Sequence, residues 1–174
     1  MGQFHNHTFP NETADYRVAR DALLAEEMEL RRQADKVSAM RRALPLGGAV
    51  NEDYVFQNFS GEDTKLSDLF TDKSPDLFIY NFMWQPGGDA CPVCTSFMDS
   101  LNGAVLHIQQ YYNVAVAAKA PAADLKAWAK ARNWSNLNFL SSGQTTYNTD
   151  YKAEDEDGRQ LMMLHAFRKT NDGI

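Results

Sequence analysis

Polar and apolar positions in the first quarter of the chain follow a helical repeat. Residues 12–44 contain neither proline nor glycine. Apolar side chains recur every seven positions along this segment, at Tyr16, Leu23, Leu30, Val37 and Leu44. The spacing predicts one long helix with a narrow apolar seam, with an N-cap at Asn11 and an end at Pro45. Because the seam is too narrow for a core helix, two roles stay open: docking on its own domain, or contact with a second copy of the chain.

The rest of the chain alternates between strand-like and helix-like segments. Strands are expected over residues 53–59, 76–84, 113–120, 137–140 and 160–169. Helical segments are expected over residues 65–70, from Cys91-Pro92 to residue 108 with a break or kink at Asn102-Gly103, and over residues 122–134, where Trp128 and Trp134 would be core residues. Residues 141–150 are expected to form a loop and residues 154–158 an exposed acidic turn. This order predicts an α/β fold in which helices pack on the faces of a sheet.

The pattern divides the chain into two parts. Residues 1–45 form an N-terminal tail and the long charged helix, and residues 46–174 form the α/β domain. The chain ends on Asn171-Asp172-Gly173, a signal that normally opens a hairpin, but no return strand follows it. Either this end frays, or the domain is truncated here and its natural form continues past Ile174.

Composition narrows the classes of function. The 174 residues are 44% hydrophobic and carry 17 basic and 23 acidic side chains, a net charge of −6. This acidic balance argues against a nucleic-acid partner, which needs clustered lysine and arginine. No apolar run approaches the roughly 18 residues of a membrane helix, and the first residues lack the features of a secretory signal. A cytoplasmic protein with no membrane or nucleic-acid partner is therefore expected.

Both cysteines of the chain lie in the segment DACPVCTSFMDS, at Cys91 and Cys94. They follow a buried strand and open a helix, where backbone amides and the helix dipole favour a thiolate. Pro92 suits the first helical turn, because its missing N–H is not needed there. The spacing predicts Cys91 as an exposed nucleophile and Cys94 as the resolving thiol of a redox pair.

Other interpretations of the same residues stay open. The cysteines could be two buried and inert thiols. A zinc site would need four ligands, or three and a water, and the only further candidates are His107, His165 and the tail residues His5 and His7, so neither a metal nor a cofactor is expected. His107 could serve as a base near the thiols or be a partly buried histidine, and Asp99 could perturb the pair or be a surface charge.

The order of these pieces resembles the thioredoxin-like superfamily, especially its peroxiredoxin and thiol-reductase branches. A closer resemblance is to DUF899, a family of bacterial thioredoxin-like proteins of unknown function. The segments that carry it are 43-ALP-45, 54-YVF-56, 80-YNFMW-84, 91-CPVC-94, 99-DSLNGAVLHI-108, 117-AAKAP-121, 133-NW-134, 141-SSG-143 and 147-YNTDY-151. The resemblance implies a thioredoxin-like fold, with a central mixed sheet and helices on both faces, but no substrate.

The sequence departs from the patterns of these relatives at three places. Thioredoxins have an aromatic residue before the first cysteine, where this chain has Ala90, although Trp84 could cover the site. They also carry a cis-proline before a later strand, and the last proline here is Pro121, before a helix. Peroxiredoxins have threonine three residues before the attacking cysteine, where this chain has Gly88. The departures weaken general protein-disulfide reduction and peroxidase chemistry as expectations.

Two functions of different classes follow. The first is a thiol–disulfide oxidoreductase that uses Cys91 and Cys94 on an unknown thiol or disulfide substrate. The second is a redox-silent binding or scaffold protein with a thioredoxin fold, which forms a homodimer through its N-terminal helix.

Overall fold

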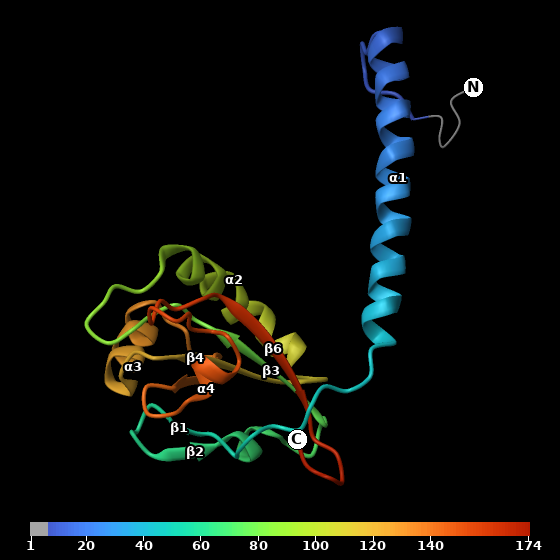
Figure 1. The fold of residues 1–174 in the computed structure, drawn as a ribbon. Coiled ribbons are helices and arrows are strands. Elements are labelled where there is room, and N and C mark those ends of the chain that lie inside the picture. Colours follow the sequence, from blue (N-terminus) through green and yellow to red (C-terminus); the bar gives the residue numbers. More distant parts are fainter. Residues whose placement is uncertain (1–6) are drawn as a thin grey trace. The chain divides into compact units, whose positions relative to one another are not determined.

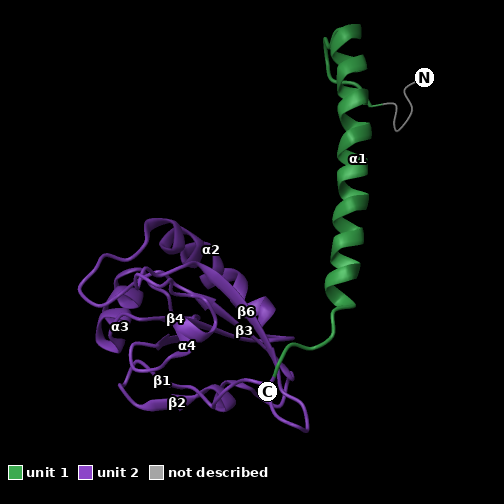
Figure 2. Cartoon of the chain, viewed as in Figure 1, with its two compact units in different colours: residues 1–48 green, residues 49–174 purple. Residues whose placement is uncertain are grey.

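The computed structural model describes residues 7–174 of the chain (Figure 1). These residues belong to two compact units, Met1–Gly48 and Ala49–Ile174 (Figure 2). No helix within residues 7–174 is both long and apolar enough to cross a lipid bilayer.

The first unit consists mainly of one helix, α1 (Ala14–Arg42). Its N-cap is Thr13, whose side-chain oxygen accepts a hydrogen bond from the backbone N–H of Tyr16 at 3.1 Å. The prediction of Asn11 as the N-cap is wrong, because Asn11 lies two residues earlier with a positive φ of 62°. The helix ends three residues before Pro45, and none of its residues is buried.

The second unit is built on a mixed sheet of six strands in the order β2-β1-β5-β4-β3-β6. The strands are β1 (Val55–Gln57), β2 (Asp63–Lys65), β3 (Asp76–Asn81), β4 (Asn113–Ala118), β5 (Phe139–Ser141) and β6 (Met163–Arg168). β4 pairs in parallel with β3 and β5, whereas the other neighbours are antiparallel. The crossovers between the parallel strands run through α2 (Pro92–Ile108) and α3 (Ala122–Ala131).

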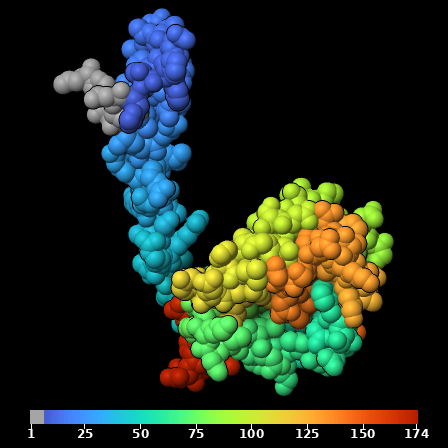
Figure 3. Space-filling view, turned by 180° about the vertical axis from the view of Figure 1, so that it is seen from behind, coloured from blue at the N-terminus to red at the C-terminus, as the bar shows by residue number. Residues whose placement is uncertain are grey.

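The two faces of the sheet carry two separate hydrophobic clusters. Tyr80 and Phe82 point to the face covered by α2 and α3, where they pack with Cys94 and Met98. Figure 3 shows these helices adjacent on the surface, α2 in yellow and α3 in orange. Neighbouring positions of β3 point to the opposite face, which is covered by the short 3-10 helix η1 (Leu66–Leu69) and by α4 (Tyr147–Asp150). The predicted α/β fold with helices on both faces is therefore confirmed.

Three local predictions differ from the structure. Residues 63–65, where no strand was expected, form β2, and residues 147–150, expected as loop, form α4. The break expected at Asn102-Gly103 is absent, because α2 runs without interruption from Pro92 to Ile108. At the C-terminal end, Thr170 and Gly173 form an isolated antiparallel bridge, so the expected turn at Asn171-Asp172 is present.

Candidate functional site

Cys91 lies beside the end of the central strand β3. After Asn81, the end of β3, the next three residues continue alongside the chain that leaves β4. The N–H of Phe82 donates to Ala117 O, and Trp84 O accepts from the N–H of Ala120, both at 2.8 Å. A loop of residues 85–90 then returns the chain, and the N–H of Cys91 donates to Met83 O at 3.2 Å. The sheet therefore fixes the point at which α2 begins.

Cys91 is itself the N-cap of α2. Its Sγ accepts a hydrogen bond from the backbone N–H of Cys94 at 3.4 Å, and its carbonyl accepts from the N–H of Thr95 at 2.9 Å. Pro92 occupies the first helical position, where no N–H is required. A sulfur at this place faces the unpaired amides and the positive end of the helix dipole, which stabilise a thiolate.

The two thiols, which are both free, differ in accessibility and acidity. Burial of Cys91 acts to raise its pKa, but the amide of Cys94, the Cys94 thiol and the amide of Val93 outweigh it, so the pKa of Cys91 lies below its ordinary value. Cys94 is completely buried, and this burial raises the pKa of its thiol in spite of contacts with Tyr80 and with the backbone of Met83. The geometry thus makes the accessible Cys91 thiol the more acidic of the two and the buried Cys94 thiol, one turn further along α2, the less acidic.

Tyr80 is a site residue that sequence reasoning missed. Its hydroxyl is buried and has no hydrogen-bond partner among the described residues. Burial raises the pKa of Tyr80 above its ordinary range, and the neighbouring Cys94 thiol raises it further. Tyr80 also contacts the ring of Phe97 on α2, with 5.0 Å between ring centroids. In the sequence, Tyr80 lies in the apolar run that precedes the cysteines. Ordinary core residues lie in the same run, so this position did not distinguish Tyr80 as a site residue.

Trp84 forms a hydrogen bond across the loop that precedes Cys91. The indole N–H of Trp84 donates to Gly88 O at 2.8 Å, and its ring packs against Trp128 with 6.0 Å between centroids. Trp84, Ala90 and Cys91 all pack on the cluster beneath α2 and α3. Trp84 and Cys91 therefore pack against the same cluster, although Ala90 precedes the cysteine directly.

The segment that enters β6 reaches the same edge of the sheet. Met163 pairs with Asn81, the last residue of β3, so residues 160–162 lie near the strand end that leads to Cys91. This segment contains Leu161 and Met162, which are 39% and 54% exposed. All peptide bonds between residues 7 and 174 are trans, so no cis-proline stands in the described chain.

Two further candidates lie away from the thiols. His107 is exposed in the last turn of α2, sixteen residues and about 24 Å along the helix from Cys91. Both interpretations of His107, as a base near the thiols and as a partly buried residue, are therefore wrong. Asp99 accepts hydrogen bonds from Arg132 and from the indole N–H of Trp134, which lowers the pKa of its carboxyl and ties α2 to the end of α3.

The described residues hold no evident metal centre. Within residues 7–174, no three His, Cys, Asp or Glu side chains are grouped so that they could hold a metal ion. His165 instead lies on the opposite face of the sheet, where its Nδ1 faces the hydroxyl of Tyr147 at 2.8 Å and its Nε2 faces Tyr151 O at 2.9 Å. His5 lies outside the described residues.

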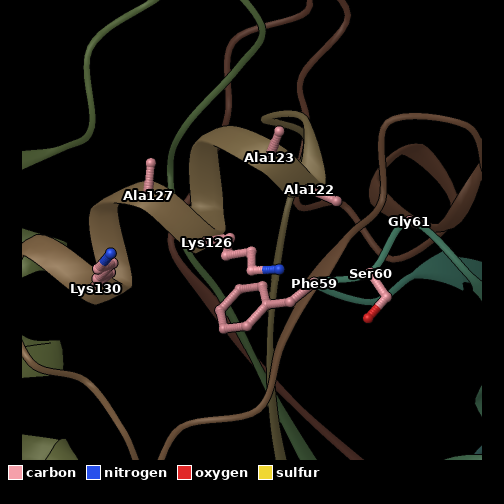
Figure 4. A pocket seen from close by; sticks show the side chains of 8 residues that line it. All are labelled: Phe59, Ser60, Gly61, Ala122, Ala123, Lys126, Ala127 and Lys130. Atoms are coloured by element: carbon pink, nitrogen blue, oxygen red, sulfur yellow. The ribbon is translucent and has the colours of Figure 1, made fainter.

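A shallow hollow on the surface is separate from the cysteines. It has a volume of about 430 Å³ and lies between the turn after β1 and one side of α3. Figure 4 shows Phe59 across from the alanines of α3, with the side chain of Lys126 extending toward it. Neither Cys91 nor Cys94 lines this hollow.

Comparison with known protein families gives a match that covers nearly the whole chain. The family model described as "Bacterial protein of unknown function (DUF899)" matches residues 6–173. No curated protein matches the sequence significantly.

Several solved structures share the fold of the second unit. Peroxiredoxin Q of Xanthomonas campestris is 13% identical with a TM-score of 0.52, over 71% of this chain and 86% of that one. A peroxiredoxin-like protein from Aquifex aeolicus is 16% identical with a TM-score of 0.51, over 71% and 69% of the two chains. The reduced 2-Cys peroxiredoxin of Plasmodium vivax is 17% identical with a TM-score of 0.52, over 71% of this chain and 66% of that one. These likenesses establish a thioredoxin-like fold.

Proposed function

This chain belongs to the DUF899 family of bacterial proteins of unknown function, and we propose that it is a thiol–disulfide oxidoreductase with Cys91 as nucleophile and Cys94 as resolving thiol. One observation carries the proposal. Cys91 is the partly exposed N-cap of α2, with a pKa below its ordinary value, while Cys94 is buried one turn away. A packed and inert pair would not need an accessible thiolate at a helix N-terminus.

The reaction follows from this asymmetry. The Cys91 thiolate attacks one sulfur of a substrate disulfide, a mixed disulfide forms, and the other substrate sulfur leaves as a thiolate that takes up a proton. Cys94 then loses its proton and attacks Cys91 Sγ, which closes the Cys91–Cys94 disulfide and releases the second substrate thiol. The substrate gains two electrons and two protons, and an external dithiol must return the same number to the protein.

A disulfide is a better match to this site than a peroxide. The residue three positions before Cys91 is Gly88, which has no side chain that could contact a peroxide oxygen. One protein of similar fold, the bacterioferritin comigratory protein of Xanthomonas campestris, is described as having alkyl peroxide reduction activity, at 14% identity to this chain. Hydrogen peroxide is therefore the appropriate competing oxidant in the assay.

The experiment is a redox titration of the full chain with single-cysteine variants. In glutathione or dithiothreitol buffers of graded potential, the wild type is expected to form an intramolecular disulfide reversibly, detected by mass spectrometry after alkylation. Cys94→Ser should trap a mixed disulfide at Cys91, whereas Cys91→Ser should trap none. In Cys94→Ser, the rate of iodoacetamide alkylation should rise with pH around a midpoint below about 8.5, the value of a free thiol.

Two outcomes would contradict the proposal. One is the absence of an intramolecular disulfide at every potential, and the other is a Cys91 midpoint at or above that of a free thiol. Either result would favour the second candidate, a redox-silent binding protein, for which the observation is an exposed apolar seam on α1. Rapid oxidation by peroxide but not by disulfides would instead assign peroxidase chemistry to Cys91.

A further inference from the structure

The long helix α1 presents an apolar seam that is not covered. Three residues of the seven-residue repeat that lie in α1, Tyr16, Leu23 and Leu30, are between 47% and 71% exposed. Leu44, two residues past the end of α1, is 69% exposed. No residue of α1 is buried. Helices in proteins gain most of their stability from the packing of an apolar face, and exposed ion pairs along a helix add only a few tenths of a kcal/mol each. We therefore expect another surface to pack against the seam.

The charges of α1 are separated along its length. Residues 14–29 carry five carboxylates and two guanidinium groups, a net charge of −3. Residues 31–42 carry five cationic side chains and one carboxylate, a net charge of +4. Acidic residues near the start of a helix and basic ones near its end also favour the helix dipole, but that effect is limited to the first and last turns. The segregation in α1 continues to the middle of the helix, at Glu29 and Arg31, so the dipole does not explain it.

Only some of the charged side chains of α1 form ion pairs with each other. Arg20 pairs with Glu27, and Arg31 with Asp35. In contrast, several charged residues form no ion pair within the part of the chain that the structure describes: Asp15 and Glu26 in the acidic half, and Lys36, Arg41 and Arg42 in the basic half. The helix thus offers unpaired negative charge in its first half and unpaired positive charge in its second half.

We propose that the seam of α1 binds α1 of a second copy of this chain in antiparallel orientation. The apolar repeat is symmetric about Leu30, so reversing one helix places Leu23 opposite Val37 of the second copy and Leu30 opposite its own counterpart. The same reversal sets each acidic half against a basic half, whereas a parallel pair would set like charges side by side. Glu26 and Gln33 lie beside the seam, three residues after Leu23 and Leu30. In the antiparallel pair, Glu26 of one copy comes close to the level of Gln33 of the other, so that the two side chains can hydrogen-bond.

This interface does not depend on the chemistry of Cys91. Because its orientation is set by charge, its stability should fall as ionic strength rises. Docking of the seam on the second unit of the same chain, or on an unrelated protein, would leave the purified chain monomeric. These two alternatives are therefore outcomes of the tests that follow.

The first test measures the mass of the full chain in solution. Sedimentation equilibrium should give a dimer at low salt, with a dissociation constant that rises with sodium chloride. Leu30→Asp should shift the chain to the monomer, while Ala39→Asp, which introduces the same residue on the opposite face of α1, should leave the dimer intact. Circular dichroism of both variants checks that the second unit stays folded. A monomer at every concentration, or equal effects of the two variants, would overturn the proposal.

The second test determines orientation by cross-linking in a Cys91→Ser, Cys94→Ser background. Positions 23 and 37 are about 21 Å apart along the helix, far beyond the reach of a disulfide. In an antiparallel pair, Leu23→Cys alone and Val37→Cys alone should not cross-link on oxidation, whereas a mixture of the two should, and Leu30→Cys should cross-link to itself. Self-linking of Leu23→Cys would indicate a parallel pair, and no cross-link at any position would remove the interface.

Discussion

Burial acts on Cys91 and Cys94 in the same direction, yet their acidities separate in opposite directions. For Cys91 the amides at the start of α2 outweigh burial, whereas Cys94 is further inside and burial prevails. Groups that stabilise the Cys91 thiolate also stabilise the dithiol relative to the disulfide, and they make Cys91 the better leaving group in exchange. Because burial raises the pKa of Cys94, the slow step is expected to be deprotonation and attack by Cys94.

Tyr80 is the side chain that should influence that step. Its hydroxyl acts to lower the pKa of Cys94, so Tyr80→Phe should leave Cys94 less often ionised and slow closure of the disulfide several-fold. While Cys94 is protonated, the Tyr80 hydroxyl is buried without a hydrogen-bond partner, so its loss should leave the unfolding free energy unchanged or raise it by about 1 kcal/mol. Rapid-quench alkylation of the mixed disulfide measures the rate. The exposed Tyr111→Phe is the matched control, and an unchanged closure rate in Tyr80→Phe would exclude the role.

His165 should make stability depend on pH. Burial lowers its pKa below the ordinary 6.5, and its Nδ1 can accept from the Tyr147 hydroxyl only when neutral. As pH falls below about 6.5 the unfolded chain binds the proton first, so the unfolding free energy should decrease until the folded-state pKa is passed. Urea unfolding at pH 7.5, 6 and 5 measures this. His165→Phe should be less stable at pH 7.5 but should show a smaller decrease toward pH 5; an identical decrease would assign it to other groups.

The continuous helix α2 could not be predicted from the local sequence around Asn102 and Gly103. Asn-Gly predicts a break, but the side chain of Asn102 accepts from the N–H of Asn136 at 3.0 Å and donates to Asn133 O at 3.3 Å. These bonds come from residues more than thirty positions away, so the sequence pattern near Asn102 could not reveal them. Long periodic segments such as α1 were predictable, whereas the three-residue β2 and the four-residue α4 depend on pairing and packing with distant residues.

The same helix offers a stabilising substitution. Gly103 lies inside α2, and a Cβ added there would have no neighbouring atom within 4 Å. Gly103→Ala should therefore raise the unfolding free energy by about 0.5–1 kcal/mol through helix propensity. Gly143→Ala is the matched control, because its Cβ would lie 2.9 Å from Lys119 O and should destabilise the chain. Urea unfolding of the three proteins measures both effects, and a destabilised Gly103→Ala would mean that the glycine has another role.

The strands of the sheet could be predicted from the sequence, but their order in the sheet could not. The alternation of strands and helices indicated a sheet with helices on its faces, and the apolar run after Asp76 indicated its central strand. The segment that enters β6 lies at the sheet edge near Cys91 only because Met163 pairs with Asn81, 82 residues earlier in the chain. The position of the two cysteines on α2 could be predicted from the sequence, whereas the residues that other elements bring close to them, such as Tyr80, could not.

The division into two units leads to a last prediction. The hydrophobic clusters on both faces of the sheet are formed by residues from Val50 onward, so residues 49–174 contain the complete core. This fragment should fold cooperatively, with the Cys91 alkylation profile of the full chain and a midpoint of thermal unfolding within about 5 °C of it, which corresponds to roughly 1 kcal/mol for a domain of this size. It should also sediment as a monomer, because the apolar seam of α1 is missing. Far-UV circular dichroism on heating and sedimentation equilibrium measure the two properties. A fragment that is unfolded would show that α1 contributes to the core of the second unit, and a folded fragment that remains dimeric would place the interface outside α1.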